Sequence, residues 1–106
     1  MQEYQLTVGL FDKDAEEQII STVCAKQIID YILIERMGLY AYTMLECEGR
    51  YKMLSTGNIV TEPSLIIIIC VDNDIDIKLV VNYIKKELNQ ESVMIKISNQ
   101  CNIVLA

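Results

Sequence analysis

Alternating apolar and polar residues predict strands in three parts of the chain, which are residues 4–11, 39–53 and 93–98. A fourth stretch, 65–71 (LIIIICV), is apolar at every position and predicts a strand covered on both faces. Residues 55–58 (STGN) form a turn that joins the second and third strands as a hairpin. Pro63 lies in the returning half of this hairpin and predicts an edge or a bulge there.

Apolar residues at three- and four-residue spacing predict two amphipathic helices. The first runs from Val23 to about Met37, with Ser21 or Thr22 as N-cap and Gly38 at its C-terminal end. The second runs over 77–88 and ends near Asn89, with Asp74 or a neighbour as N-cap. Two short segments, 18–22 (QIIST) and 102–106 (NIVLA), are expected to add strand pieces.

The resulting order, β-α-β-β-α-β, is the split βαβ pattern of ferredoxin-like folds. We therefore predict one α+β domain over residues 1–106, with a four-stranded antiparallel sheet in the order 4-1-3-2 and both helices on one face. The third strand is central in this sheet. One set of its alternating side chains meets the helices, and the other set lies on the helix-free face.

The helix-free face is predicted to be apolar over an area that soluble monomers seldom leave exposed. We favour a homo-oligomer, a dimer, that buries this face. The alternative is that 18–22 and 102–106 fold over it within one chain. The residues expected at the interface are Tyr40, Tyr42, Met44, Ile66, Ile68 and Met94.

Composition narrows the class of protein. The chain has 106 residues, of which 52% are hydrophobic and 23% charged, so it can bury a real core. No apolar run approaches the roughly 20 residues of a membrane helix, and no membrane partner is expected. A net charge of −6 argues against nucleic acid. The N-terminal residues lack the pattern of a secretory signal, so the expected location is the cytoplasm.

No metal or cofactor site is expected. The four cysteines are far apart in sequence, there is no histidine, and the cysteines are predicted to be small buried hydrophobes. Residues 72–76 (DNDID) begin like a calcium loop, but Ile77 stands where such a loop needs glycine, which favours a helix cap. The acidic segment 12–17 is interpreted as a solvated loop. Gly9 is isolated and indicates a bulge or a close approach within a strand.

One polar cluster on the hairpin is a candidate binding site. With the turn centred on Thr56 and Gly57, Arg50 and Glu62 are expected opposite one another as a cross-strand ion pair. We favour a solvated hairpin face. The alternative is a cleft rim that binds a small anionic ligand or a protein partner. The candidate binding residues are Glu46, Glu48, Arg50, Tyr51 and Glu62.

Two stretches, 48–69 and 83–97, resemble a group of small bacterial and phage-encoded proteins with a ferredoxin-like fold. Gly49, Tyr51, Glu62 and the Gln90-x-Ser-Val step match the short motifs of that group. The resemblance implies the fold and draws attention to Tyr51 and Glu62, and it implies no activity. The basic residue often found near Glu62 in that group is missing here.

The sequence favours a non-enzymatic, oligomeric binding or regulatory module, of phage or mobile-element origin. No catalytic residues are assigned, because there is no histidine and no serine or cysteine is placed beside a base. The alternative is a small dimeric enzyme of ferredoxin-like type, in which Glu46, Glu48 or Tyr51 performs acid–base chemistry.

Overall fold

The computed structural model describes residues 2–72 and 75–98, and it has the predicted order of elements. A π-helical segment, Tyr31–Arg36, continues the first helix. The remaining elements are β1 (Gln2–Gly9), α1 (Thr22–Asp30), β2 (Thr43–Lys52), β3 (Ile59–Val71), α2 (Ile77–Glu87) and β4 (Met94–Ser98).

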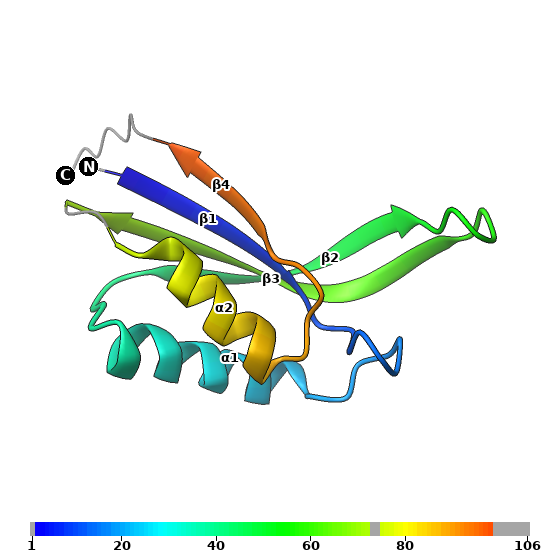
Figure 1. The fold of residues 1–106 in the computed structure, drawn as a ribbon, viewed down its shortest axis with the longest axis horizontal. Helices are drawn as coiled ribbons and strands as arrows, with labels where there is room; N and C mark the ends of the chain where they lie inside the picture. The colour runs from blue at the N-terminus through cyan, green and yellow to red at the C-terminus, as the bar shows by residue number, and fades with distance from the viewer. Residues whose placement is uncertain (1, 73–74, 99–106) are drawn as a thin grey trace.

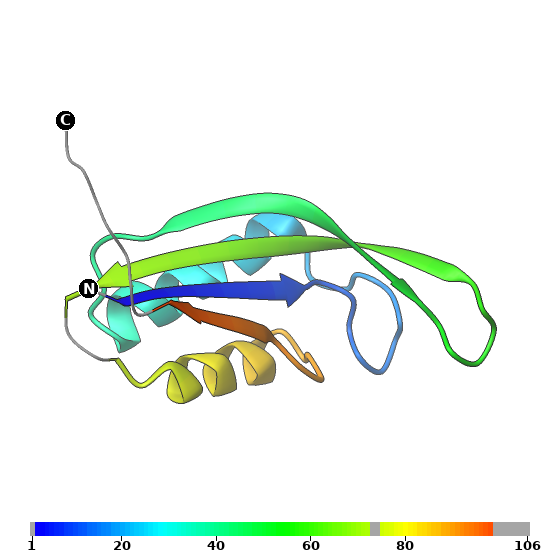
Figure 2. The ribbon, with the colours of Figure 1, turned by 90° about the horizontal axis from the view of Figure 1, so that it is seen from above.

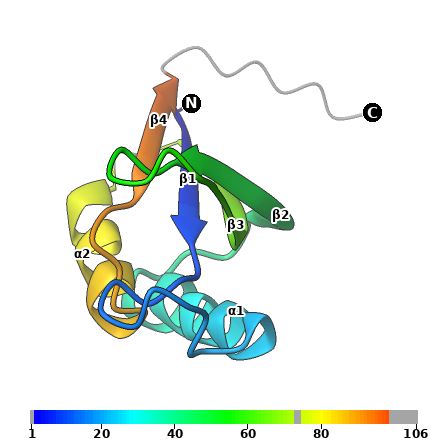
Figure 3. The same ribbon diagram turned by 90° about the vertical axis from the view of Figure 1, so that its right-hand side faces the viewer.

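The four strands form one antiparallel sheet in the order β2-β3-β1-β4. This order is the predicted 4-1-3-2 read from the opposite edge, so the predicted fold class and topology are confirmed. Both helices cover the same face of the sheet, as the end view shows most clearly (Figure 3). No helix of residues 2–72 and 75–98 lies on the other face.

The core lies between the sheet and the helices. Leu65, Ile67 and Ile69 of β3 are fully buried there, whereas the alternate residues Ile66 and Ile68 are only partly buried on the helix-free face. Each fully buried isoleucine or leucine contributes about 1.5–3 kcal/mol by leaving water. The core residues that face them from the helices are Ala25, Ile29, Ile32, Leu33, Val80, Val81 and Ile84.

The helix ends agree with the sequence signals. The Ser21 side chain accepts a hydrogen bond from the main-chain nitrogen of Cys24 and caps α1. Asp76 caps α2 in the same way, through the nitrogen of Leu79. Gly38 takes a φ of +68°, which a residue without a Cβ adopts without strain, and the chain turns there towards β2.

The hairpin of β2 and β3 extends beyond the rest of the sheet as a two-stranded arm (Figures 1 and 2). The last pair between β1 and β3 is Gly9 with Ser64, whereas β2 and β3 stay paired as far as Lys52 and Ile59. The Pro63 carbonyl accepts a hydrogen bond from Leu10, on the side towards β1. Pro63 has no main-chain N–H, and its nitrogen lies on that same side, just past the end of β1. No hydrogen bond to β2 is therefore lost.

The predicted phase of β2 is wrong. Met44 pairs with Ile67, which is buried under the helices, so Met44 and Tyr42 face the helices and pack on the core. The Tyr42 phenol donates a hydrogen bond to the Asp30 carboxylate of α1. Leu45 takes the expected place on the helix-free face, opposite Ile66. The physical reason is that side chains alternate, so a shift of one residue moves each of them to the other face.

Of the other residues expected at an interface, Met94 and Ile66 both pair with Thr7 and lie on the helix-free face, with Ile68 two residues further along β3. Tyr40 precedes β2 and is 96% exposed. Whether a second copy covers this face stays a prediction.

Two smaller expectations are wrong. Residues 18–22 form no strand, because 18–20 are irregular and Thr22 already begins α1. Cys24 is exposed rather than buried, while Cys47 and Cys70 are half-buried. Cys101 and the segment 102–106 lie outside the described residues. In the described part of the chain, no helix has the length and apolar character needed to cross a bilayer.

Candidate functional site

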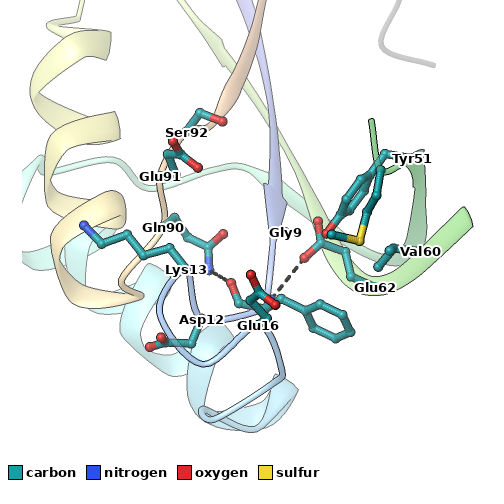
Figure 4. A pocket seen from close by; sticks show the side chains of 12 residues that line it. Gly9, Asp12, Lys13, Glu16, Tyr51, Val60, Glu62, Gln90, Glu91 and Ser92 are labelled. Atoms are coloured by element: carbon teal, nitrogen blue, oxygen red, sulfur yellow. Dashed lines mark hydrogen bonds between the residues drawn. The ribbon is translucent and has the colours of Figure 1, made fainter. Parts of the chain in front are cut away.

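A cleft of about 330 Å³ opens where β1 ends (Figure 4). Tyr51, Val60 and Glu62 form one wall, at the base of the β2–β3 arm. The opposite wall comes from the loop after β1 and from residues 90–92, between α2 and β4. Gly9 lies between the two walls. Chain segments that are far apart in the sequence therefore meet at one end of the sheet.

The Glu62 carboxylate is held at a defined position in this cleft. It reaches from β3 across the end of β1, where the main-chain N–H of Phe11 donates to Glu62 Oε2 at 3.1 Å. Gly9 lies directly beneath it, and a Cβ at position 9 would stand 2.4 Å from Glu62 Oε1. Only glycine leaves room for the carboxylate here, which is the close approach that the isolated Gly9 predicted.

The Tyr51 ring lies beside this carboxylate (Figure 4). Tyr51 pairs with Val60 and Glu62 pairs with Gly49, so Tyr51 and Glu62 are diagonal neighbours on one face of the arm. Tyr51 is 48% exposed, and its ring is open to the cleft. An anion and an aromatic ring therefore stand side by side on this wall.

Side-chain amides fix the opposite wall. Asn89 donates to Asp12 Oδ2 and to Asp14 Oδ2, both at 2.9 Å, and Gln90 Nε2 donates to the Phe11 carbonyl at 2.8 Å. Asn89 adopts a φ of +48°, a conformation that asparagine tolerates better than most residues. The turn after α2 thus clamps the loop that follows β1.

The cleft is acidic. Among the residues that the structure describes, four carboxylates line it, those of Asp12, Glu16, Glu62 and Glu91, against the one ammonium of Lys13. The hydrogen bond from the Asn89 side chain, followed by those from the main-chain nitrogens of Ala15 and Asp14, lowers the pKa of Asp12. A cavity with this charge attracts cations and repels phosphate groups.

The predicted ion pair between Arg50 and Glu62 is wrong. Arg50 pairs with Thr61 rather than with Glu62, so the two side chains point to opposite faces of the arm. Arg50 instead forms an exposed ion pair with Glu48, at 3.2 Å. Glu46 lies on the same face as Arg50 and pairs with Lys26 of α1, at 2.7 Å.

The five candidate residues therefore separate into two groups. Tyr51 and Glu62 line the acidic cleft, whereas Glu46 and Glu48 line a different cavity beside Pro63. Arg50 lines neither of these two cavities. Within the described residues, no group of three or more Cys, Asp or Glu side chains is arranged to hold a metal ion.

Sequence reasoning missed Phe11 and the roles of Gly9 and Gln90 in this cleft. The contacts that define them join residues 51 and 79 positions apart in the chain. Phe11 acts through its main chain, which leaves no trace in the residue type. Gln90 had a weak signal, because it falls within the motif of the resemblance to phage-encoded proteins.

No protein-family model matches the chain, and no curated protein shows significant similarity to it. Among solved structures, a phage SAM lyase in complex with S-methyl-5'-thioadenosine is similar, with a TM-score of 0.66 and 23% identity over 92% of this chain and 79% of that chain. A phage SAM lyase in the apo state has a TM-score of 0.62 and 27% identity, over 92% and 78%. These similarities agree with the fold and with the phage-related resemblance in the sequence.

Proposed function

We propose that this protein binds S-adenosylmethionine in the acidic cleft and cleaves it as a lyase. The observation that carries the proposal is the Glu62 carboxylate, held by the Phe11 N–H beside the Tyr51 ring in a cleft of negative charge. The fold shared with a phage SAM lyase, whose structure contains S-methyl-5'-thioadenosine, supports the same substrate class.

The chemistry of the cleft suits this substrate. S-adenosylmethionine carries a permanent positive charge on its sulfonium sulfur, and a carboxylate and the face of an aromatic ring both attract such a cation. Ribose hydroxyl groups can donate hydrogen bonds to a carboxylate. A volume of about 330 Å³ is at the lower end of the range for small-molecule sites and is open on one side.

The bond that breaks follows from the product. S-methyl-5'-thioadenosine keeps the methyl and adenosyl groups, so cleavage occurs between sulfur and the side-chain carbon of the amino acid. The electron pair stays on sulfur and cancels its charge. A lyase adds no water, so the carbon that leaves sulfur must form a new bond within the amino-acid fragment. In ring closure, an oxygen of the fragment's own carboxylate bonds to this carbon. In elimination, a carboxylate of the cleft takes a proton from the neighbouring carbon, and the electron pair of that C–H bond forms a double bond. Identification of the second product decides between these two routes.

Glu62 is expected to act mainly on substrate binding. The positive charge leaves sulfur as the bond breaks, so a fixed anion beside the sulfonium stabilises the bound substrate at least as much as the transition state. Its contribution to rate is then to hold the substrate in a reactive orientation. Replacement of Glu62 should raise KM by a larger factor than it lowers kcat.

The two similar solved structures bear on the choice between the two functions that the sequence left open, a binding module and an enzyme. Both structures are described as a lyase, which is an enzyme, so we develop the enzyme and not the non-enzymatic module. Of the three residues considered for acid–base chemistry, only Tyr51 lines the acidic cleft. Glu46 and Glu48 pair with Lys26 and Arg50 on the opposite face.

The test is chromatographic detection of S-methyl-5'-thioadenosine after incubation with S-adenosylmethionine. We expect release by the wild type, and a fall in kcat/KM of about 10- to 100-fold in Glu62→Gln, since a contact with a charged group is worth ~1.5–3 kcal/mol. Tyr51→Leu should also weaken binding, because it removes the aromatic ring.

Arg50→Gln is the matched control, because it changes a charge on the same arm but on the other face. Its kcat/KM should stay within about twofold of wild type, since the exposed ion pair contributes little. Binding without any product would favour the non-enzymatic module. The absence of both product and binding would refute the proposal.

A further inference from the structure

We infer that Gln90 is a positioning residue for the Glu62 carboxylate and acts through the main chain of Phe11. The kinetic consequence of this inference rests on the proposed function, whereas the geometric part does not. Gln90 also lines the cleft, but its side-chain amide donates to the Phe11 and Leu88 carbonyls and not to Glu62.

The contacts form a continuous connection between the two walls of the cleft (Figure 4). Gln90 Nε2 donates to the Phe11 carbonyl at 2.8 Å, and the Phe11 N–H donates to Glu62 Oε2 at 3.1 Å. Phe11 is thus held from both sides. Any rotation of its main chain would break one of these bonds.

Gln90 is itself fixed. It is 8% exposed, and Nε2 also donates to the Leu88 carbonyl at 3.2 Å, so two main-chain acceptors orient the amide. Its own N–H donates to the Lys85 carbonyl at 2.9 Å, which joins it to the last turn of α2. A buried amide with these bonds is a rigid connection, because its release would remove a donor from the part-buried bond to Phe11 and from the buried bond to Leu88.

Phe11 needs this support because the sheet no longer constrains it. The last pair between β1 and β3 is Gly9 with Ser64, and the Leu10 N–H makes one further bond, to Pro63. Beyond that bond, the direction of the Phe11 N–H depends on the loop. Glu62 lies on the arm, where β3 pairs only with β2. The connection through Gln90 therefore sets where the carboxylate stands relative to the far wall.

A double-mutant cycle with Glu62 tests this role. We expect Gln90→Leu to weaken the affinity for S-methyl-5'-thioadenosine, measured by calorimetry, because the ribose hydroxyl groups of this uncharged ligand donate to the Glu62 carboxylate. The same substitution should raise KM for S-adenosylmethionine by about tenfold, with kcat changed less. In the Glu62→Gln background the same substitution should change affinity by less than about twofold, because the carboxylate is already gone. Equal factors in the two backgrounds would overturn the inference.

Asn89→Gly is the matched control. It removes the neighbouring amide, which holds Asp12 and Asp14 rather than Phe11, and glycine keeps the positive φ. Its effect on affinity should be the same in both Glu62 backgrounds. If Gln90→Leu does not fold, Gln90→Glu replaces it, because glutamate has the same shape and puts an acceptor where the Phe11 carbonyl needs a donor.

A measurement without ligand separates this inference from the proposed function. The amide resonance of Phe11 and the carboxyl-carbon resonance of Glu62 are compared between wild type and Gln90→Glu by NMR at one pH. We expect both to shift, and unchanged resonances would overturn the inference even in an active enzyme. If both shift but the wild type neither binds nor cleaves S-adenosylmethionine, the positioning role stands and the proposed function fails.

Discussion

Gly9 of β1 lies against the Glu62 carboxylate of β3, so closely that a Cβ at position 9 would stand 2.4 Å from Oε1 and 2.7 Å from the carboxyl carbon. No real Cβ tolerates such distances, so one of the two groups must move. The contact is with the end of a flexible side chain, and the carboxylate is the group that yields.

We therefore expect Gly9→Ala to displace Glu62 while the sheet stays intact. The affinity for S-methyl-5'-thioadenosine, which is uncharged, should fall by about tenfold, because its ribose hydroxyl groups lose a hydrogen bond to the displaced carboxylate. Gly49→Ala is the control on the same arm, because its Cβ would meet Ser64 Oγ at 2.9 Å and no residue that lines the acidic cleft within 3.4 Å. Equal loss of affinity in both variants would contradict the expected role of Gly9.

Tyr42, directly before β2, donates a hydrogen bond to Asp30 of α1, and this bond predicts that stability depends on pH in the alkaline range. Burial, followed by the hydrogen bond to Asp30 and the charge of Asp30, raises the pKa of Tyr42 to about 12. The folded state then favours the neutral phenol, and the unfolded chain loses its proton near pH 10. This contribution is complete below pH 10 and is lost as the pH rises to about 12.

Tyr42→Phe should therefore lower the free energy of unfolding by ~1 kcal/mol at neutral pH, as expected for one side-chain hydrogen bond. The difference between the variant and wild type should shrink between pH 10 and pH 12, because the wild type alone loses this contribution. Urea unfolding at several pH values measures it. A difference that stays constant over this range would show that the phenol proton is not involved.

The hydrogen bond from the Asn89 side chain to Asp12 predicts that the stability of the fold depends on pH in the acidic range. This bond lowers the pKa of Asp12 below the ordinary value of 3.8, so the folded state favours the carboxylate. This contribution is present above pH 3.8 and is lost as the pH falls through the lowered pKa. Asn89→Gly should melt at a lower temperature than wild type at pH 7, and the two melting temperatures should converge as the pH falls through the lowered pKa of Asp12. Circular dichroism measures both melting temperatures. A difference between them that persists in acid would contradict this prediction.

The helix-free face predicts self-association. Leu45, Ile66, Ile68 and Met94 lie on this face, and Leu45 and Met94 are 48% and 70% exposed. We expect light scattering over a range of concentrations to give the mass of a dimer, and Ile68→Lys to shift the mass towards the monomer. Val23→Lys, at a position of α1 that is 64% exposed, is the control and should not change the mass. A monomer at all concentrations would refute this prediction.

The spacing of apolar residues, together with the residues that begin or end a helix or strand, determined the elements and their order. Period-two and period-three-to-four patterns reflect how side chains alternate along a strand and recur along a helix, and these are properties of short segments. Ser21, Gly38 and Pro63 took the roles that their residue types predict, because each role depends on the residue's own donors, acceptors and φ preference. The order of elements then restricted the topology to the ferredoxin-like sheet that the structure contains.

The candidate site depended on a register that no local pattern specifies. Period two is compatible with either face, so a one-residue difference in the pairing of β2 with β3 put Arg50 and Glu62 on opposite faces and placed Tyr51 beside Glu62. Only the tertiary structure brought Gly9, Phe11 and Gln90 to that carboxylate. The two hydrogen bonds of Phe11 join residues 51 and 79 positions apart in the chain. Both use main-chain atoms, which every residue type shares.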